Sequence, residues 1–158
     1  MRYANIIYND TVNVDSGVAL TVYAQGCPHK CEGCFSQQTW DFKGGKEWTK
    51  QDENNLIYCL ENYKYDWLVL LGGEPMCNLD FCQYFIDITK KYQKNIKVWC
   101  YTGFEFDKVK DLNIMEYIDV IKCGKFIKKL HDARLKYYGS ANQKLYRREN
   151  GVWLEIIE

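Results

Sequence analysis

Short apolar runs alternate with amphipathic stretches through the middle of the chain. The apolar runs are rich in β-branched and other apolar residues, which predicts buried strands. These runs cover residues 18–24, 66–71, 96–101 and 117–121. Between them, apolar residues recur at helical spacing over residues 79–92 and more briefly over residues 106–115. Strands and helices in alternation favour a parallel sheet with right-handed crossovers.

The flanking segments add to this pattern. Residues 2–8 predict a first strand, and a polar, turn-rich loop follows it. Thr49 is a suitable N-cap for a helix, and Asp52 three residues later comes close to a capping box. A weak helical pattern covers residues 126–135. Near the C-terminus, an Asn-Gly pair at residues 150–151 stands between apolar residues and predicts a hairpin.

The length of the chain limits the architecture. A complete barrel of eight strand–helix units needs about 250 residues, whereas this chain has 158. We therefore expect an α/β fold of one domain over residues 1–158, built as a partial (β/α) barrel with parallel strands and a C-terminal hairpin. A small doubly wound sheet is the competing architecture.

Charge and composition exclude several kinds of partner. Lys plus Arg and Asp plus Glu both number 21, so the net charge of zero does not call for a nucleic acid or an anionic membrane. No apolar run has the length of a membrane span, and the N-terminus does not resemble a signal peptide. The eight cysteines are too sparse for a disulfide scaffold, so we expect a cytoplasmic protein whose thiols are reduced and free to bind metal.

Three cysteines follow the strand predicted over residues 18–24. Cys27, Cys31 and Cys34 are close enough in sequence to converge on one metal centre. They are one ligand short of a closed zinc site or a fully protein-ligated iron–sulfur cube, so one position of the metal centre stays open for chemistry. The alternative is a zinc knuckle whose fourth ligand comes from elsewhere, such as His29 or another cysteine.

Two further motifs stand where predicted strands end. They are Gly-Gly-Glu-Pro at residues 72–75 and Tyr-Thr-Gly at residues 101–103. Because ligands of parallel α/β folds bind at the carboxyl ends of the strands, we expect both motifs and the cysteines at one edge of the sheet. Gly72 and Gly73 would let the backbone approach a ligand closely, and Glu74 adds a carboxylate suited to an ammonium group. The plainer interpretation is a tight turn with Glu74 near a helix N-terminus.

These residues carry a family resemblance. The three cysteines followed by Gly-Gly-Glu-Pro resemble the radical S-adenosylmethionine (SAM) enzymes, and among them the activating proteins of anaerobic ribonucleoside-triphosphate reductases. Further matches cover nearly the whole chain, at residues 39–40, 98–99, 101–103, 117–120, 124–126, 139–143 and 151–153. The chain departs from the family at residues 14–17, where Gly-Pro-Gly is often found, and at Cys123, where relatives commonly carry Asp.

The resemblance implies a cofactor, a reaction and partners. Cys27, Cys31 and Cys34 would hold three irons of one 4Fe–4S cluster, and the fourth iron would bind the amino and carboxylate groups of SAM. Reductive cleavage of SAM would give methionine and a 5′-deoxyadenosyl radical, which takes a hydrogen atom from a glycine of the reductase. The implied partners are the reductase and a reducing electron donor such as flavodoxin, and a homodimer is also implied as a possible assembly.

The resemblance also implies SAM contacts. The residues concerned are Gly33, Cys34, Phe35, Gly72, Gly73 and Glu74. The first three would pass their backbone close to the adenine end of SAM. The turn that contains the other three would meet the methionine ammonium group.

The remaining cysteines receive a plainer interpretation. Cys59 and Cys100 lie in apolar patterns and are expected in the core. Cys77 and Cys82 flank the start of a predicted helix, and a second cluster would need more thiols than these two. Cys123 stands near a strand end, where a functional role is the minority interpretation.

Other polar residues near the motifs are expected to be incidental. His29 is predicted to be exposed, and His131 has no recognisable partner. Lys122 and Lys125 are predicted to be solvated, although either would reach a carboxylate at the active edge. Residues 139–143 are predicted to position a partner or the C-terminal tail, with no mechanism evident.

Two rival functions stay open. One is a radical SAM enzyme that acts on another glycyl-radical enzyme or on a small molecule, which would cleave SAM without oxidising the reductase's glycine. The other is a non-catalytic iron–sulfur or zinc module, which would cleave no SAM under strong reductant.

Overall fold

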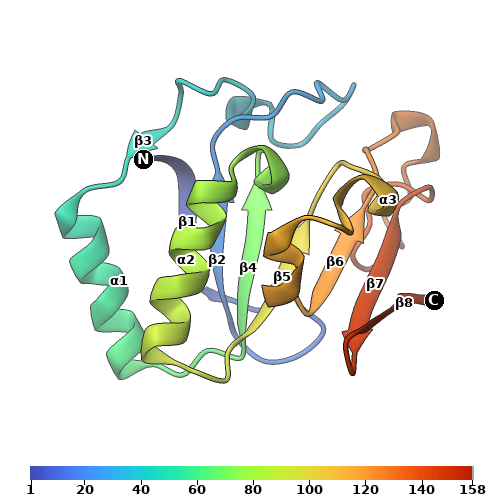
Figure 1. Ribbon diagram of the computed structural model, residues 1–158. Coiled ribbons are helices and arrows are strands. Elements are labelled where there is room, and N and C mark those ends of the chain that lie inside the picture. The colour runs from blue at the N-terminus through green and yellow to red at the C-terminus, as the bar shows by residue number, and fades with distance from the viewer. Residues whose placement is uncertain (158) are drawn as a thin grey trace.

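One mixed sheet organises the protein (Figure 1). In the computed structural model, which describes residues 1–157, eight strands are hydrogen-bonded in the order β3-β1-β2-β4-β5-β6-β7-β8. The strands are β1 (Arg2–Asp10), β2 (Ala19–Ala24), β3 (Lys46–Glu47), β4 (Trp67–Gly72), β5 (Lys97–Tyr101), β6 (Val120–Cys123), β7 (Lys144–Glu149) and β8 (Val152–Ile156). The sheet is open and does not close on itself, which confirms the α/β partial barrel.

The parallel strands lie at the centre of the sheet. β2, β4, β5 and β6 run in the same direction, so their carboxyl ends share one edge. β1 and β7 pair antiparallel to the outer members of this group, and β8 completes the predicted C-terminal hairpin. Asn150 and Gly151 both have positive φ, at 51° and 77°, as a type I′ turn requires.

Helices cover one face of the sheet (Figure 1). They are α1 (Lys50–Asn62), α2 (Leu79–Tyr92) and α3 (Phe106–Val109). Thr49 and Asp52 form the reciprocal capping box that starts α1. Side chains of α1 and α2 such as Leu56 and Phe85 pack against strand residues such as Leu68. Among the described residues, no helix combines the length and the apolar character needed to cross a bilayer.

The opposite face has a separate core built from strands and loops. Trp67 and Trp99 meet edge to face with ring centroids 5.2 Å apart, and Tyr101 and Tyr137 pack on the same cluster. Among the described residues, this core receives no side chain from α1, α2 or α3. The doubly wound alternative is therefore wrong, because helices lie on only one face.

Two helix predictions differ from the structure. The pattern over 106–115 yields only α3 and then a 3₁₀ turn, Asn113–Tyr117, because Leu112 adopts an extended conformation between them. β6 therefore starts later than the strand predicted over 117–121. The predicted helix over 126–135 is wrong, since the segment contains only the 3₁₀ turn Lys128–Leu130 and bonds instead to residues 140 and 141.

Candidate functional site

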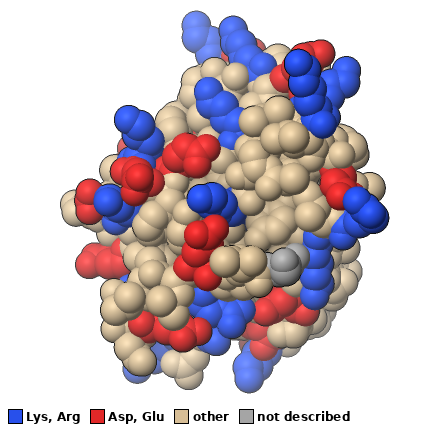
Figure 2. Space-filling model, turned by 90° about the vertical axis from the view of Figure 1, so that its right-hand side faces the viewer, with Lys and Arg blue, Asp and Glu red and all other residues tan. Residues whose placement is uncertain are grey.

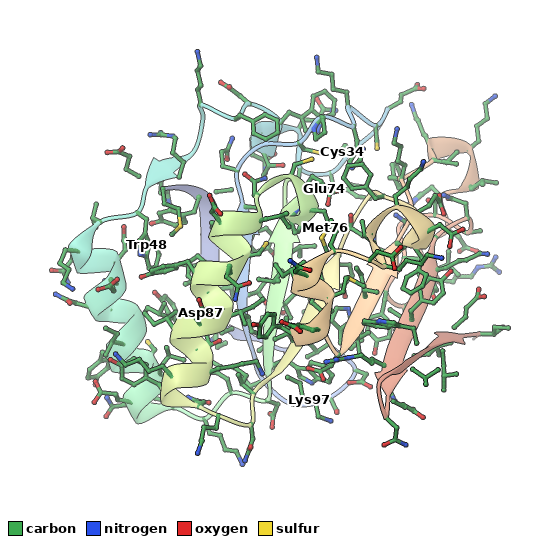
Figure 3. All side chains as sticks on the ribbon, viewed as in Figure 1. Cys34, Trp48, Glu74, Met76, Asp87 and Lys97 are labelled. Carbon is green, nitrogen blue, oxygen red and sulfur yellow. The ribbon has the colours of Figure 1, made fainter. Side chains whose placement is uncertain are left out.

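A small cavity lies at the carboxyl edge of the parallel strands. Its volume is about 110 Å³. It is lined by Cys27, His29, Cys31, Cys34, Thr39, Trp40, Gly72, Gly73, Glu74, Gly103, Lys122, Gly124, Lys125, Phe126 and Gln143. The cysteines, the Gly-Gly-Glu-Pro turn and the residues after β5 therefore meet at one place, as the topology predicted. Figure 3 shows Cys34 and Glu74 at this end of the sheet and Lys97 at the other.

A larger hollow lies at the opposite end of the strands. It measures about 750 Å³ and includes Ser16, Asp66 and Lys97 among its lining residues. None of the residues of the three motifs lines it. Although it is larger, we place the functional site at the carboxyl edge, where the chemically distinctive side chains converge.

The three cysteines are partly exposed on an irregular loop, residues 27–34, which we call the cluster loop. Hydrogen bonds from Cys27 N to Trp40 O (3.1 Å) and from Cys34 N to Cys31 O (3.1 Å) shape this loop. Burial raises the pKa of the Cys27 thiol to about 11, so a metal cation must displace its proton before the thiolate forms at neutral pH.

The donor set fits an iron–sulfur cluster. Three thiols line one cavity, and a cluster gives each thiolate an iron of its own. Within residues 1–157, no three His, Cys, Asp or Glu side chains are grouped closely enough to hold a single metal ion. That Cys27, Cys31 and Cys34 hold three irons and leave one cluster position without a protein ligand stays a prediction.

The two glycines of the turn allow its backbone to touch the preceding chain. A Cβ atom on Gly73 would collide with the carbonyl oxygen of Gly26, and one on Gly72 would collide with the backbone of Ala24. Gly73 N donates to Ala24 O at 2.8 Å, and Glu74 N donates to Gly26 O at 2.9 Å. The two glycines were predicted to let the backbone approach a ligand. In the structure, they let it approach the end of β2 and the start of the cluster loop.

The Glu74 carboxylate is buried and surrounded by donors. Its side chain is 1% exposed. One oxygen accepts hydrogen bonds from Thr102 Oγ1 (2.6 Å) and Met76 N (2.9 Å), and the other accepts from Gly103 N (2.7 Å). His29 Nε2 lies 2.7 Å from that second oxygen. The carboxylate thus joins the turn to the end of β5, and a contact with a ligand's ammonium group stays a prediction.

His29 differs most from what its sequence context predicted. It was expected to be exposed and incidental, but its side chain is only 6% exposed and is bonded to Glu74. The partner lies 45 positions away, so no local pattern indicates the contact. The only available signal was its place between two cysteines.

Two lysines also border the cavity. Lys125 is exposed, as predicted, whereas Lys122 is partly buried on the strand face that carries Tyr101. Burial lowers the pKa of Lys122 to about 8, and the negative charge of Glu74 opposes this shift. The ammonium nitrogen lies 5.5 Å from the centre of the Tyr101 ring.

The segment after β6 closes one side of the cavity. Gln143 accepts hydrogen bonds from Gly139 N and Ser140 N and donates to Gly124 O at 2.8 Å. These bonds hold residues 139–143 against the end of β6. His131, for which no partner was predicted, packs against Phe35 and bonds to Gly139 O.

Of the three predicted adenine contacts, Cys34 lines the cavity, whereas Gly33 and Phe35 do not. Gly33 has a φ of 75° and faces Lys128. Phe35 is 73% exposed, lies outside the cavity lining and packs against Phe126 with ring centroids 5.3 Å apart. Their contact with SAM stays a prediction.

The other cysteines lie away from the cavity lining. Cys82, Cys100 and Cys123 are buried in the helix-side core, as predicted for Cys100. Cys59 is partly exposed against the same core, and Cys77 is exposed.

Comparisons with known proteins identify the family of this chain. The family model described as a 4Fe-4S single cluster domain matches residues 15–146. An "anaerobic ribonucleoside-triphosphate reductase-activating protein" of Enterobacteria phage T4 is 33% identical over 155 residues, which cover 97% of this chain and 98% of that protein. Proteins of the same name from Vibrio cholerae and Escherichia coli (strain K12) are 33% and 30% identical, over 93% and 92% of this chain and 98% of each relative. The chain therefore belongs to the family of anaerobic ribonucleoside-triphosphate reductase-activating proteins and contains a 4Fe-4S single cluster domain.

Proposed function

We propose that this protein activates an anaerobic ribonucleoside-triphosphate reductase by reductive cleavage of SAM. The observation that carries the proposal is the convergence of three thiols and the Gly-Gly-Glu-Pro turn on one cavity at the carboxyl edge of the sheet. The relatives' name supplies the partner. With its cluster bound, the site would supply one electron to SAM and so yield a 5′-deoxyadenosyl radical, which takes a hydrogen atom from a glycine of the reductase.

The protein's own groups bind and orient the reactants. Cys27, Cys31 and Cys34 would leave one iron open for the methionine end of SAM. The Glu74 carboxylate is already saturated with donors, so we assign the ammonium contact to the backbone of the turn. Within the described residues, no backbone hydrogen bond ends on the carbonyl oxygen of Gly73, which makes it the available acceptor.

The experiment that tests this function is anaerobic reconstitution with iron and sulfide, followed by dithionite and SAM. We expect 5′-deoxyadenosine from the protein alone and a glycyl radical, visible by electron paramagnetic resonance (EPR), when the reductase is added. Cleavage of SAM without the glycyl radical would favour an enzyme for another substrate. No cleavage by a protein that holds its cluster would favour a non-catalytic module.

We also propose that the electron comes from a small acidic carrier such as flavodoxin. Residues 125–136 contain five Lys or Arg and one Asp in a chain of zero net charge. Lys128 lies 3.6 Å from Glu32 of the cluster loop, so this basic segment borders the site. Several Lys and Arg side chains stand along the upper edge of the face shown in Figure 2. The rate at which such a carrier reduces the cluster should fall as the salt concentration rises. The rate of reduction by dithionite should depend on salt differently.

The proposed reaction also bears on the location and the assembly of the protein. Because the site needs free thiols, we propose that the protein works in the cytoplasm, where thiols stay reduced. The homodimer stays a prediction, to be tested by the mass of the protein in solution.

A further inference from the structure

We propose that His29 is a positioning residue that ties the cluster loop to the Gly-Gly-Glu-Pro turn and so sets where SAM's methionine end lies relative to the three thiols. The inference rests on the proposed function and deepens it. It concerns a side chain that neither the motif spacing nor the family resemblance assigns.

The ring of His29 connects two motifs directly. Its Nε2 forms a hydrogen bond of 2.7 Å with Glu74 Oε2, the oxygen that also accepts from Gly103 N. Both side chains are nearly inaccessible, at 6% and 1% exposed. Breaking a hydrogen bond between two buried side chains leaves polar atoms unpaired, so this contact fixes the distance between the loop and the turn.

Gly103 provides the space in which the ring sits. A Cβ atom there would come within 2.6 Å of His29 Cδ2 and 2.7 Å of Nε2. Gly103 does not need positive φ, so the close approach of the ring is what requires a glycine. On another side, Phe104 meets the imidazole edge to face with ring centroids 4.7 Å apart. The third motif of the site is thus shaped around His29.

The backbone of His29 contacts a cysteine of the cluster loop. Its N–H donates a hydrogen bond to the thiol of Cys27. One residue therefore contacts a cluster ligand through its main chain and the turn through its ring. Glu74 extends the connection to Thr102 and Gly103, so the ends of β2, β4 and β5 are joined by one network.

The local backbone supports a positioning role. Lys30, the next residue, has a φ of 51°, a backbone conformation that residues other than glycine and asparagine rarely adopt. Such strain persists where the surrounding contacts enforce it, and it gathers at functional sites. Here the turn of the chain at Lys30 accompanies an inward-facing His29 and an outward-facing Lys30.

The test compares two substitutions at one position. His29→Phe keeps a ring but removes the N–H, whereas His29→Gln retains a side-chain N–H of similar reach. For each we would measure iron and sulfide per chain, the Kd for SAM, and the EPR change that SAM causes in the reduced cluster. We expect both variants to load the cluster. We expect His29→Phe to bind SAM about tenfold more weakly with an altered EPR change, and His29→Gln to restore most of the affinity.

The outcomes separate the claims. If His29→Phe with a full cluster binds SAM as the wild type does, the positioning role is overturned. If that variant fails to load iron, Gly103→Ala replaces it, because the added methyl displaces the His29 ring while the sequence of the cluster loop stays that of the wild type. Weaker SAM binding by loaded Gly103→Ala supports the role, and unchanged binding overturns it. A loaded wild type that cleaves no SAM would instead overturn the proposed function.

Discussion

Six of the eight cysteines form two groups with opposite surroundings. The loop cysteines are Cys27, Cys31 and Cys34, and the core cysteines are Cys82, Cys100 and Cys123. Burial raises the pKa of Cys27 in the first group to about 11 and that of Cys123 in the second to about 12, so these two pKa values do not distinguish the groups. Access does, because the loop cysteines line a cavity while the core cysteines are at most 1% exposed.

The difference follows from where each cysteine stands relative to a strand. Cys100 and Cys123 are strand residues that point to the helix-covered face, as their neighbours in the core show. The loop cysteines come after β2 has ended, on backbone that no ladder constrains. The same side chain is therefore a small core residue in one place and a candidate metal ligand in the other.

The largest effect is expected when one of the three loop cysteines is removed. In Cys31→Ala, one of three iron ligands is lost, so we expect iron content to fall severely and 5′-deoxyadenosine formation to drop to background. Iron analysis and chromatography of the products measure both. Cys100→Ala is the matched control, and equal loss in the two variants would contradict the division into groups.

The second effect tests how the loop is held. In Gly73→Ala, the new methyl would meet the carbonyl oxygen of Gly26, which is backbone and cannot move aside easily. We expect the free energy of unfolding to fall by about 3 kcal/mol, together with poorer cluster loading. Gly151→Ala is the control, since nothing lies within 4 Å of that position and only its φ of 77° is at stake. Normal loading of Gly73→Ala would refute the contact.

A third change sharpens the core side of the comparison. In Cys100→Ser, a hydroxyl replaces a thiol at a site that is 0% exposed. We expect a loss of about 2 kcal/mol in the free energy of unfolding, because the hydroxyl is poorly solvated there. Denaturant titration measures it, and iron content should equal that of the wild type. Lower iron content at full folding would show that Cys100 serves the site.

The smallest effect concerns Lys122, whose charge acts on thiols of both groups. Its pKa is about 8 against an ordinary 10.5, so burial of the ammonium destabilises the fold below pH 8, and the penalty relaxes as pH rises toward 10.5. Before iron is added, Lys122→Met should therefore be more stable than the wild type at pH 7, by about 1 kcal/mol. The gap should narrow by pH 10. A gap that does not change between these pH values would refute the buried ammonium.

Much of the fold was predictable because its signals are local. The run before Gly72 and the spacing from Leu79 to Tyr92 gave β4 and α2 almost residue by residue. The segment after Gly124 was mispredicted as a helix because long-range bonds decide it, from Ile127 N to Ser140 Oγ and from Ala141 N to Leu130 O. Local periodicity contains no information about such partners.

Some features of the candidate site could be predicted from the sequence and others could not. The convergence of the cysteines with the turn followed from parallel topology alone. The bond between His29 and Glu74 and the burial of Lys122 did not, because each depends on how side chains from different strand ends pack. Glu74 was recognised as important, but its saturated carboxylate could be seen only in the structure.

The central claim is that the three loop cysteines hold a cluster with one iron open to SAM. Mössbauer spectroscopy of protein reconstituted with isotopically enriched iron tests it most directly. We predict a 4Fe–4S cluster in which one iron changes its signal when SAM is added, while the other three stay as they were. Four irons that are all indifferent to SAM, or no cluster at all, would contradict the account.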